Sequence, residues 1–346
     1  MIQRHGYWLE KAQVQVTAVA AGVAAYYVIW PLVSPTDPAG PLALIAEGSV
    51  AKAGLLAAAA CGLAALCCLT TVSSRPAGTL VAVLIGLGGL SVRSGSMRAL
   101  LWARQTDLAA LYWQMALEVL VLAAILFVAG VVVRVLRKVT AGLAGKWSWT
   151  DVLADTTEDR QRAYLRSMDS GKGDAQGGPL KGLVGGGFAR IILERLALTD
   201  SRRAGRRMPG GDVLTRCGLC FLLCLVIAVS VVSILAQSAE RGQLLFALLA
   251  GCFLGTLIGY QVFPTRLCFP AWCAPIAAAL GFYVLAAVGA VRTGQSAWML
   301  VEPCRQALPI DWMTAGVGGA MLGYWVSCRM HELKFLESLE EQDEGA

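Results

Sequence analysis

Long apolar runs constrain this chain more than any other feature. Backbone N–H and C=O groups in lipid must be hydrogen-bonded within their own segment, and the alternating pattern of barrel strands is missing, so these runs predict helices. The chain is 57% hydrophobic and 15% charged, whereas a soluble domain is typically about 25% charged. An all-α, polytopic integral membrane protein is predicted. Its eight expected spans, most of them near the roughly 20 residues that cross a bilayer, are 14–33, 50–73, 77–92, 109–133, 213–236, 242–263, 268–291 and 309–328.

Two parts of the chain resemble each other. Residues 76–113 align without gaps with 275–312, which pairs Val92-Arg93-Ser94-Gly95 with Val291-Arg292-Thr293-Gly294. A second match pairs Ala46-Glu47 with Ala239-Glu240. Both matches occur in the same order, and both carry charged residues at the same place relative to a helix end. The pattern predicts two tandem four-helix repeats with the same orientation, as in parallel repeats of transporters.

This duplication divides the chain into four segments. They are a first four-helix unit at 1–133, a basic loop at 134–212, a second four-helix unit at 213–330 and an acidic tail at 331–346. Lys and Arg are concentrated on the side that contains both termini and the loop. Because cytoplasmic loops carry an excess of Lys and Arg, both termini are predicted to lie in the cytoplasm, with the protein in the cell (inner) membrane.

The 134–212 loop carries 15 Lys and Arg residues and 9 Asp and Glu residues. Each basic residue near the membrane surface is attracted to anionic lipid by about 1 kcal/mol. A solvated linker, whose charge only enforces the topology, explains the same composition, and the loop is also a candidate docking surface for a protein partner. Nucleic-acid binding is not expected, because stacking aromatic residues do not interleave the basic ones. The predicted lipid-facing basic cluster is Arg202, Arg203, Arg206 and Arg207.

Four charged residues recur at equivalent outer positions of the two repeats. Arg93 and Arg292 end the third helix of each unit, where a positive charge suits the helix dipole and the following glycine suits a helix cap. Glu47 and Glu240 begin the second helix of each unit on the same side. The two glutamates are therefore expected to pair with the two arginines, either as structural ion pairs or as an outer vestibule that binds a polar solute.

Glu118 is the one carboxylate well inside a predicted span. An ionisable residue inside the membrane is costly, so it is a functional-site hypothesis by default. Its two interpretations are a protonatable coupling site and a protonated carboxyl that is hydrogen-bonded to a neighbouring helix, with Gln114 one turn earlier as a candidate partner.

Other patterns indicate packing. Glycines at four-residue spacing let helices approach closely, and they occur as Gly251, Gly255 and Gly259 and as Gly319 and Gly323. Cys217, Cys220 and Cys224 share a helical face, but no histidine or carboxylate lies near enough in sequence to complete a metal site. No cofactor, metal site or enzymatic activity is predicted.

Two functional classes remain. The first is a transporter or permease whose pathway lies between the two repeats, by analogy with duplicated transporters. The alternative is a non-catalytic membrane scaffold or assembly subunit of a larger membrane complex. A water-filled cavity that reaches Glu118 would favour transport, and a dry, glycine-packed interface would favour the scaffold.

Overall fold

The computed structural model describes residues 2–35, 37, 40–45, 50–71, 76–104, 106–144, 210–265, 268–293 and 303–344, and within them every regular element is a helix. The first half contains α1 (Ile2–Ala24), the π-helix η1 (Ala25–Ile29), α2 (Trp30–Val33), α3 (Val50–Thr70), α4 (Pro76–Arg93), α5 (Met97–Ala103) and α6 (Leu108–Ala144). The second half contains α10 (Gly210–Leu235), α11 (Arg241–Val262), α12 (Phe269–Thr293), the 3₁₀-helix η3 (Pro303–Gln306), α13 (Pro309–Asp311), the π-helix η4 (Trp312–Gly316) and α14 (Val317–Glu344).

Six helices in the described part of the chain are long and apolar enough to cross a membrane, which indicates a multi-pass membrane protein. A seventh crossing results if α4 and α5, bent by 51° at the break between them, count as one span. The predicted eighth span, 309–328, is not among these candidates. It is divided among α13, η4 and α14, and charged Arg329 follows it directly.

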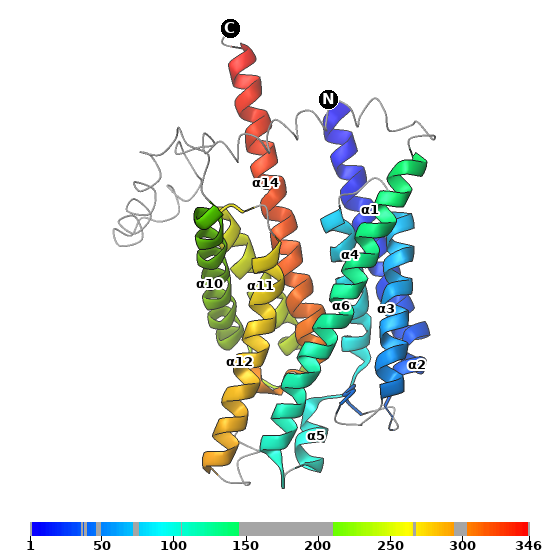
Figure 1. The fold of residues 1–346 in the computed structure, drawn as a ribbon, viewed down its shortest axis with the longest axis vertical. Helices are drawn as coiled ribbons and strands as arrows, with labels where there is room; N and C mark the ends of the chain where they lie inside the picture. Colours follow the sequence, from blue (N-terminus) through cyan, green and yellow to red (C-terminus); the bar gives the residue numbers. More distant parts are fainter. Residues whose placement is uncertain are drawn as a thin grey trace, which may run out of the picture. The chain divides into compact units, whose positions relative to one another are not determined.

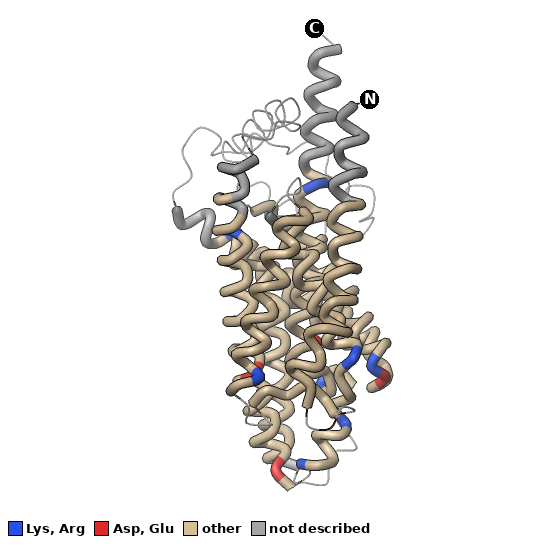
Figure 2. The backbone as a smooth tube through the Cα atoms, turned by 90° about the vertical axis from the view of Figure 1, so that its right-hand side faces the viewer, with Lys and Arg blue, Asp and Glu red and all other residues tan. Residues whose placement is uncertain are grey.

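Residues 1–144 and 216–329 group into one compact unit. Within this unit the long helices run in alternating directions along a common axis (Figure 1). The charged residues that Figure 2 colours lie mostly toward the ends of these helices, and their middle parts are almost entirely uncharged. The other unit includes 330–346, of which the structure describes the end of α14 to Glu344.

α4 is the central helix of the compact unit. It packs against α1, α3, α6, α13 and η4, and its side chains from Leu80 to Leu84 are all buried. Glycines let α4 approach α1 closely: a Cβ atom on Gly86 would collide with Ala21, and one on Gly89 with the carbonyl oxygen of Gly22. These close contacts help to hold α4 at its central position.

Glycine ridges join neighbouring helices of the second half. A Cβ atom on Gly255 of α11 would lie 2.7 Å from the carbonyl oxygen of Cys224 in α10. One on Gly323 of α14 would lie 2.5 Å from the carbonyl oxygen of Phe253 in α11. Real Cβ atoms do not approach that closely, so these contacts require glycine. The predicted packing role of the two ridges is therefore confirmed, and each ridge faces an adjacent helix of the same chain.

Candidate functional site

A buried ion pair joins two helices of the second half. Arg241, the first residue of α11, places Nη2 2.7 Å from Oδ1 of Asp311. The Asp311 side chain is 0% exposed and the Arg241 side chain 19%. Hydrogen bonds between two ionised groups are the strong ones, but burying both charges is favourable only when their remaining donors and acceptors are also satisfied.

The first half of the chain supplies those remaining partners through the end of α4. Arg241 Nε donates to the carbonyl oxygen of Ser91 at 2.8 Å, and Nη1 donates to the carbonyl oxygen of Gly95 at 2.7 Å. The last carbonyls of a helix have no partner within the helix, so the guanidinium caps the end of α4. The Ser91 hydroxyl donates to Asp311 Oδ1 at 2.8 Å and also lies 2.8 Å from the hydroxyl of Thr314.

The other oxygen of Asp311 has a local role. Oδ2 accepts the backbone N–H of Leu308 at 2.9 Å, which is one half of a capping box at the start of α13. We call Arg241, Asp311, Ser91 and Thr314 the Arg241 cluster. It connects α11 and α13–η4 of the second half with α4 of the first half, and its charges neutralise each other inside the bundle.

Glu118 lies beside a buried segment, residues 40–44, of the chain between α2 and α3. Its Oε2 accepts the backbone N–H of Ile45 at 3.1 Å, and the neighbouring side chains Leu42, Ala43 and Leu44 are all buried. Buried backbone N–H groups need an acceptor, and Glu118 supplies one where no helix or strand does. The expected bond to Gln114 is not seen: Gln114 Oε1 has no hydrogen-bond partner within the described residues.

Arg93 contacts the first helix of its own half. Its Nη1 donates to the carbonyl oxygen of Tyr26 at 2.6 Å, and its guanidinium carbon lies 4.8 Å from the Tyr26 ring centre and 5.7 Å from that of Trp30. These distances are typical of cation–π contacts. Glu240 is exposed at the start of α11.

Several predicted site residues lie outside the described part of the chain. They are Glu47, the side chain of Arg292, and the basic cluster Arg202, Arg203, Arg206 and Arg207. The two expected pairings, Glu47 with Arg93 and Glu240 with Arg292, therefore stay predictions.

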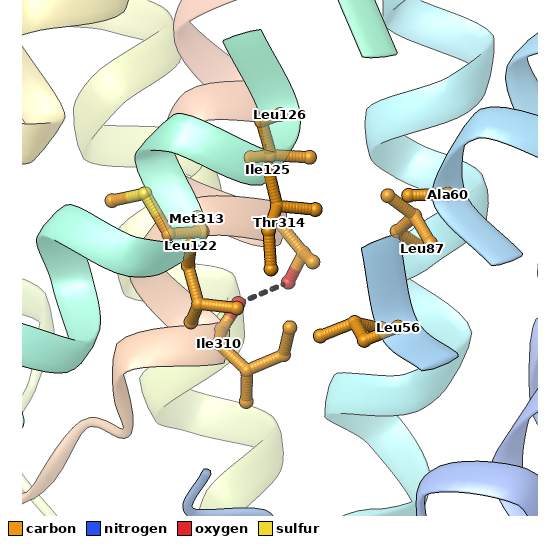
Figure 3. Close-up of a pocket in the computed structure, with 9 residues that line it drawn as sticks. All are labelled: Leu56, Ala60, Leu87, Leu122, Ile125, Leu126, Ile310, Met313 and Thr314. Carbon is orange, nitrogen blue, oxygen red and sulfur yellow. Dashed lines mark hydrogen bonds between the residues drawn. The ribbon is translucent and has the colours of Figure 1, made fainter. Parts of the chain in front are cut away.

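A small hollow lies one helical turn from Glu118 (Figure 3). It has a volume of about 10 Å³ and is lined by eight apolar side chains and Thr314. The Thr314 hydroxyl donates to the carbonyl oxygen of Ile310 at 2.7 Å. A single water needs about 10–15 Å³ and two to four polar partners, so this hollow has room for one water at most and an apolar lining that does not favour it.

Sequence reasoning missed Asp311 and assigned no partner to Arg241. The local signal was present, because Leu308-Pro309-Ile310-Asp311 places proline at the first helical position and a carboxylate two residues later, a combination typical of a helix start. The contact between Arg241 and Asp311 joins residues 70 positions apart, so no local sequence pattern predicts it.

Comparisons of the chain with models of protein families, with curated proteins and with solved structures give no match. The assignment that the fold supports is therefore that of a multi-pass membrane protein with an apolar exterior and a buried polar cluster between its halves.

Proposed function

We propose that the protein is a non-catalytic membrane scaffold or assembly subunit. The observation that carries this proposal is the Arg241 cluster at the contact between the halves. Its two charged groups pair with each other, and the guanidinium also donates to a carbonyl oxygen at the end of α4. The hollow of about 10 Å³ in the interior of the bundle supports the same conclusion, since a solute pathway through the interior needs room; the larger groove beside Ser91 and Thr314 opens on the outside of the bundle. Glu118 also has a structural role, because its carboxylate accepts the backbone N–H of Ile45.

The proposed architecture is an eight-helix bundle of two tandem repeats, with 309–328 as the eighth span. Two features support it. The long helices of the second half alternate in direction as those of the first half do (Figure 1). In addition, α4 ends at Arg93 and α12 at Thr293, within one residue of the positions that the repeat equates. Both termini and the 134–212 loop are proposed to lie in the cytoplasm, where the loop and the acidic tail offer docking surfaces for partner proteins and, for the loop, anionic lipid.

Affinity purification from native membranes tests the scaffold proposal. The full chain is compared with a variant in which residues 150–207 are replaced by a Gly/Ser linker of equal length. We expect specific proteins to co-purify with the full chain and to be lost from the variant, while both chains remain in the membrane and are monodisperse in detergent. An identical set of proteins with both chains, or none with either, would contradict the proposal.

A transporter is the second candidate, and particular elements favour it. The bend between α4 and α5 and the π-helices η1 and η4 interrupt regular helix within the bundle, and such interruptions are frequent at functional sites and in transporters. If Glu118 is a coupling site, Glu118→Gln should abolish pH-linked flux in proteoliposomes. The fold should be kept, because glutamine retains an oxygen that can accept the Ile45 N–H. Flux by the wild-type chain would overturn the scaffold proposal, and unchanged flux in the variant would remove Glu118 from the mechanism.

A further inference from the structure

A second hollow opens on the outside of the helical bundle. It is a groove of about 580 Å³ that is lined by α1 with η1, by α4, by α11 and by η4. Its lining is mostly apolar, with Ser91 and Thr314 as polar exceptions, and includes Val19, Val23 and Phe246, which are 68%, 54% and 62% exposed. Sites for small molecules usually have volumes of about 300–1,000 Å³. The groove is thus large enough for a ligand, and its lining selects an apolar one.

The groove is about as long as one leaflet of a bilayer is deep. On α1 and η1 it runs from Ala18 to Tyr27, which at the rise of an α-helix corresponds to about 14 Å. On α4 it stops at Val92, one residue before the helix ends, and on α11 it begins at Leu245, one turn after the helix starts. A bilayer has a hydrocarbon core of about 30 Å, so the groove matches the depth of a single leaflet.

A positive charge lies at the end of the groove where α4 stops. The Arg93 guanidinium is positioned by the carbonyl oxygen and the ring of Tyr26, and Tyr26 itself lines the groove. No carboxylate of a described residue forms an ion pair with Arg93. A guanidinium has five N–H donors, and its planar fork is suited to phosphate.

We propose that this groove binds one acyl chain of an anionic phospholipid from the leaflet on the Arg93 side, with the lipid phosphate at Arg93. The apolar lining, the length of one leaflet and the charge at one end all match this occupant. The charge at one end distinguishes this occupant from a transmembrane helix of a partner protein, whose surface within the hydrocarbon is apolar. The proposal concerns a lipid-facing surface and does not depend on whether the protein is a scaffold or a transporter.

Filling the groove tests where the acyl chain binds. Gly88 lines the groove, and a Cβ atom there would meet no atom within 4 Å, so Gly88→Leu places a larger side chain in the groove without a backbone collision. Gly62→Leu is the matched control, because Gly62 in α3 is equally open but does not line the groove. The full-length protein is reconstituted with phosphatidylglycerol that carries a photoreactive group midway along one chain, and cross-linked peptides are identified by mass spectrometry.

We expect cross-links to concentrate on the groove segments of α1 and α11 in the wild type and in Gly62→Leu. In Gly88→Leu they should fall about tenfold, which corresponds to about 1.4 kcal/mol. Cross-links spread evenly over all lipid-facing helices, or unchanged in Gly88→Leu, would overturn the proposal. Loss of a co-purified protein from Gly88→Leu with lipid labelling unchanged would do so too, and would indicate a partner helix instead.

Changing Arg93 tests the headgroup. We expect Arg93→Gln to retain acyl-chain labelling but to lose the preference for phosphatidylglycerol over phosphatidylcholine. Arg104→Gln, an exposed basic residue after α5, should keep that preference. Equal labelling by the two lipids in the wild type would remove Arg93 from the proposal.

Discussion

Arg241 and Asp311 are charges that the bundle can keep buried only as a pair. The idealised cost of moving one such ion into a medium of low dielectric constant is of order 20 kcal/mol, and several kcal/mol remain after relaxation. Arg241 meets this cost with Asp311 and with two carbonyl oxygens of the other half. Sequence inspection identified Glu118 because it stands alone in an apolar run, but it missed Asp311, which lies at the edge of one and gains its importance from a tertiary contact.

Removing one charge of the pair should therefore destabilise the protein more than removing both. Asp311→Leu leaves the Arg241 guanidinium buried without its counter-charge, at a cost of about 3–5 kcal/mol. Adding Arg241→Met should recover part of this loss, because apolar replacements of a buried pair are often neutral. Thermal unfolding of the purified protein in detergent measures both variants, with Arg98→Gln on the exposed surface as the control. This account would be contradicted if the unfolding temperature of the double variant were no higher than that of Asp311→Leu alone.

At the scale of elements, the sequence was sufficient for most helix positions. The predicted span 50–73 corresponds to α3 (Val50–Thr70), and the predicted span 242–263 corresponds to α11 (Arg241–Val262). These predictions succeed because an apolar run ends where the chain passes from hydrocarbon into water. The end of α6 at Ala144 was missed, since a helix that leaves the hydrocarbon need not stop there. The bend between α4 and α5 was also missed. The Ser94-Gly95 pair between the two helices is typical of a helix end. A helix-end pattern carries no information on whether another helix begins a few residues later.

The closeness of neighbouring helices makes individual glycines predictable in their effects. A methyl group on Gly319 of α14 would collide with the backbone of Leu249 in α11, and overpacking of this kind costs about 1–3 kcal/mol. Gly62 of α3 has nothing within 4 Å of its would-be Cβ. Since alanine favours a helix over glycine by about 0.5–1 kcal/mol, Gly62→Ala should be neutral or stabilising while Gly319→Ala lowers the unfolding temperature. Equal unfolding temperatures for the two variants would show that α11 and α14 are not in close contact.

For the whole molecule, the number of crossings decides how the two halves relate. Six helices are candidate spans, and α4 with α5 adds a seventh. The cluster around Asp311 bears on the eighth, because α13 and η4 lie against α4 and α6, in the interior of the bundle. Residues 309–328 therefore start among the membrane-spanning helices, although the breaks between α13, η4 and α14 keep this segment from being recognised as a span. Repeats of four helices return to their starting side, so an eighth crossing is what the proposed duplication requires.

Reporter fusions distinguish seven crossings from eight through the side on which the chain ends. With eight, a fluorescent protein fused after Ala346 should fluoresce in a bacterial host, as should one fused at the N-terminus or inserted at Gly171 of the loop, because it folds only in the cytoplasm. Alkaline phosphatase, which is active only outside, should be inactive at these sites and active when inserted at Ser296, after α12. Active phosphatase at the C-terminus together with fluorescence at the loop would mean an odd number of crossings in the second half. In that case 309–328 would fold back within the membrane without crossing it, and the two halves could not be copies of one four-helix unit.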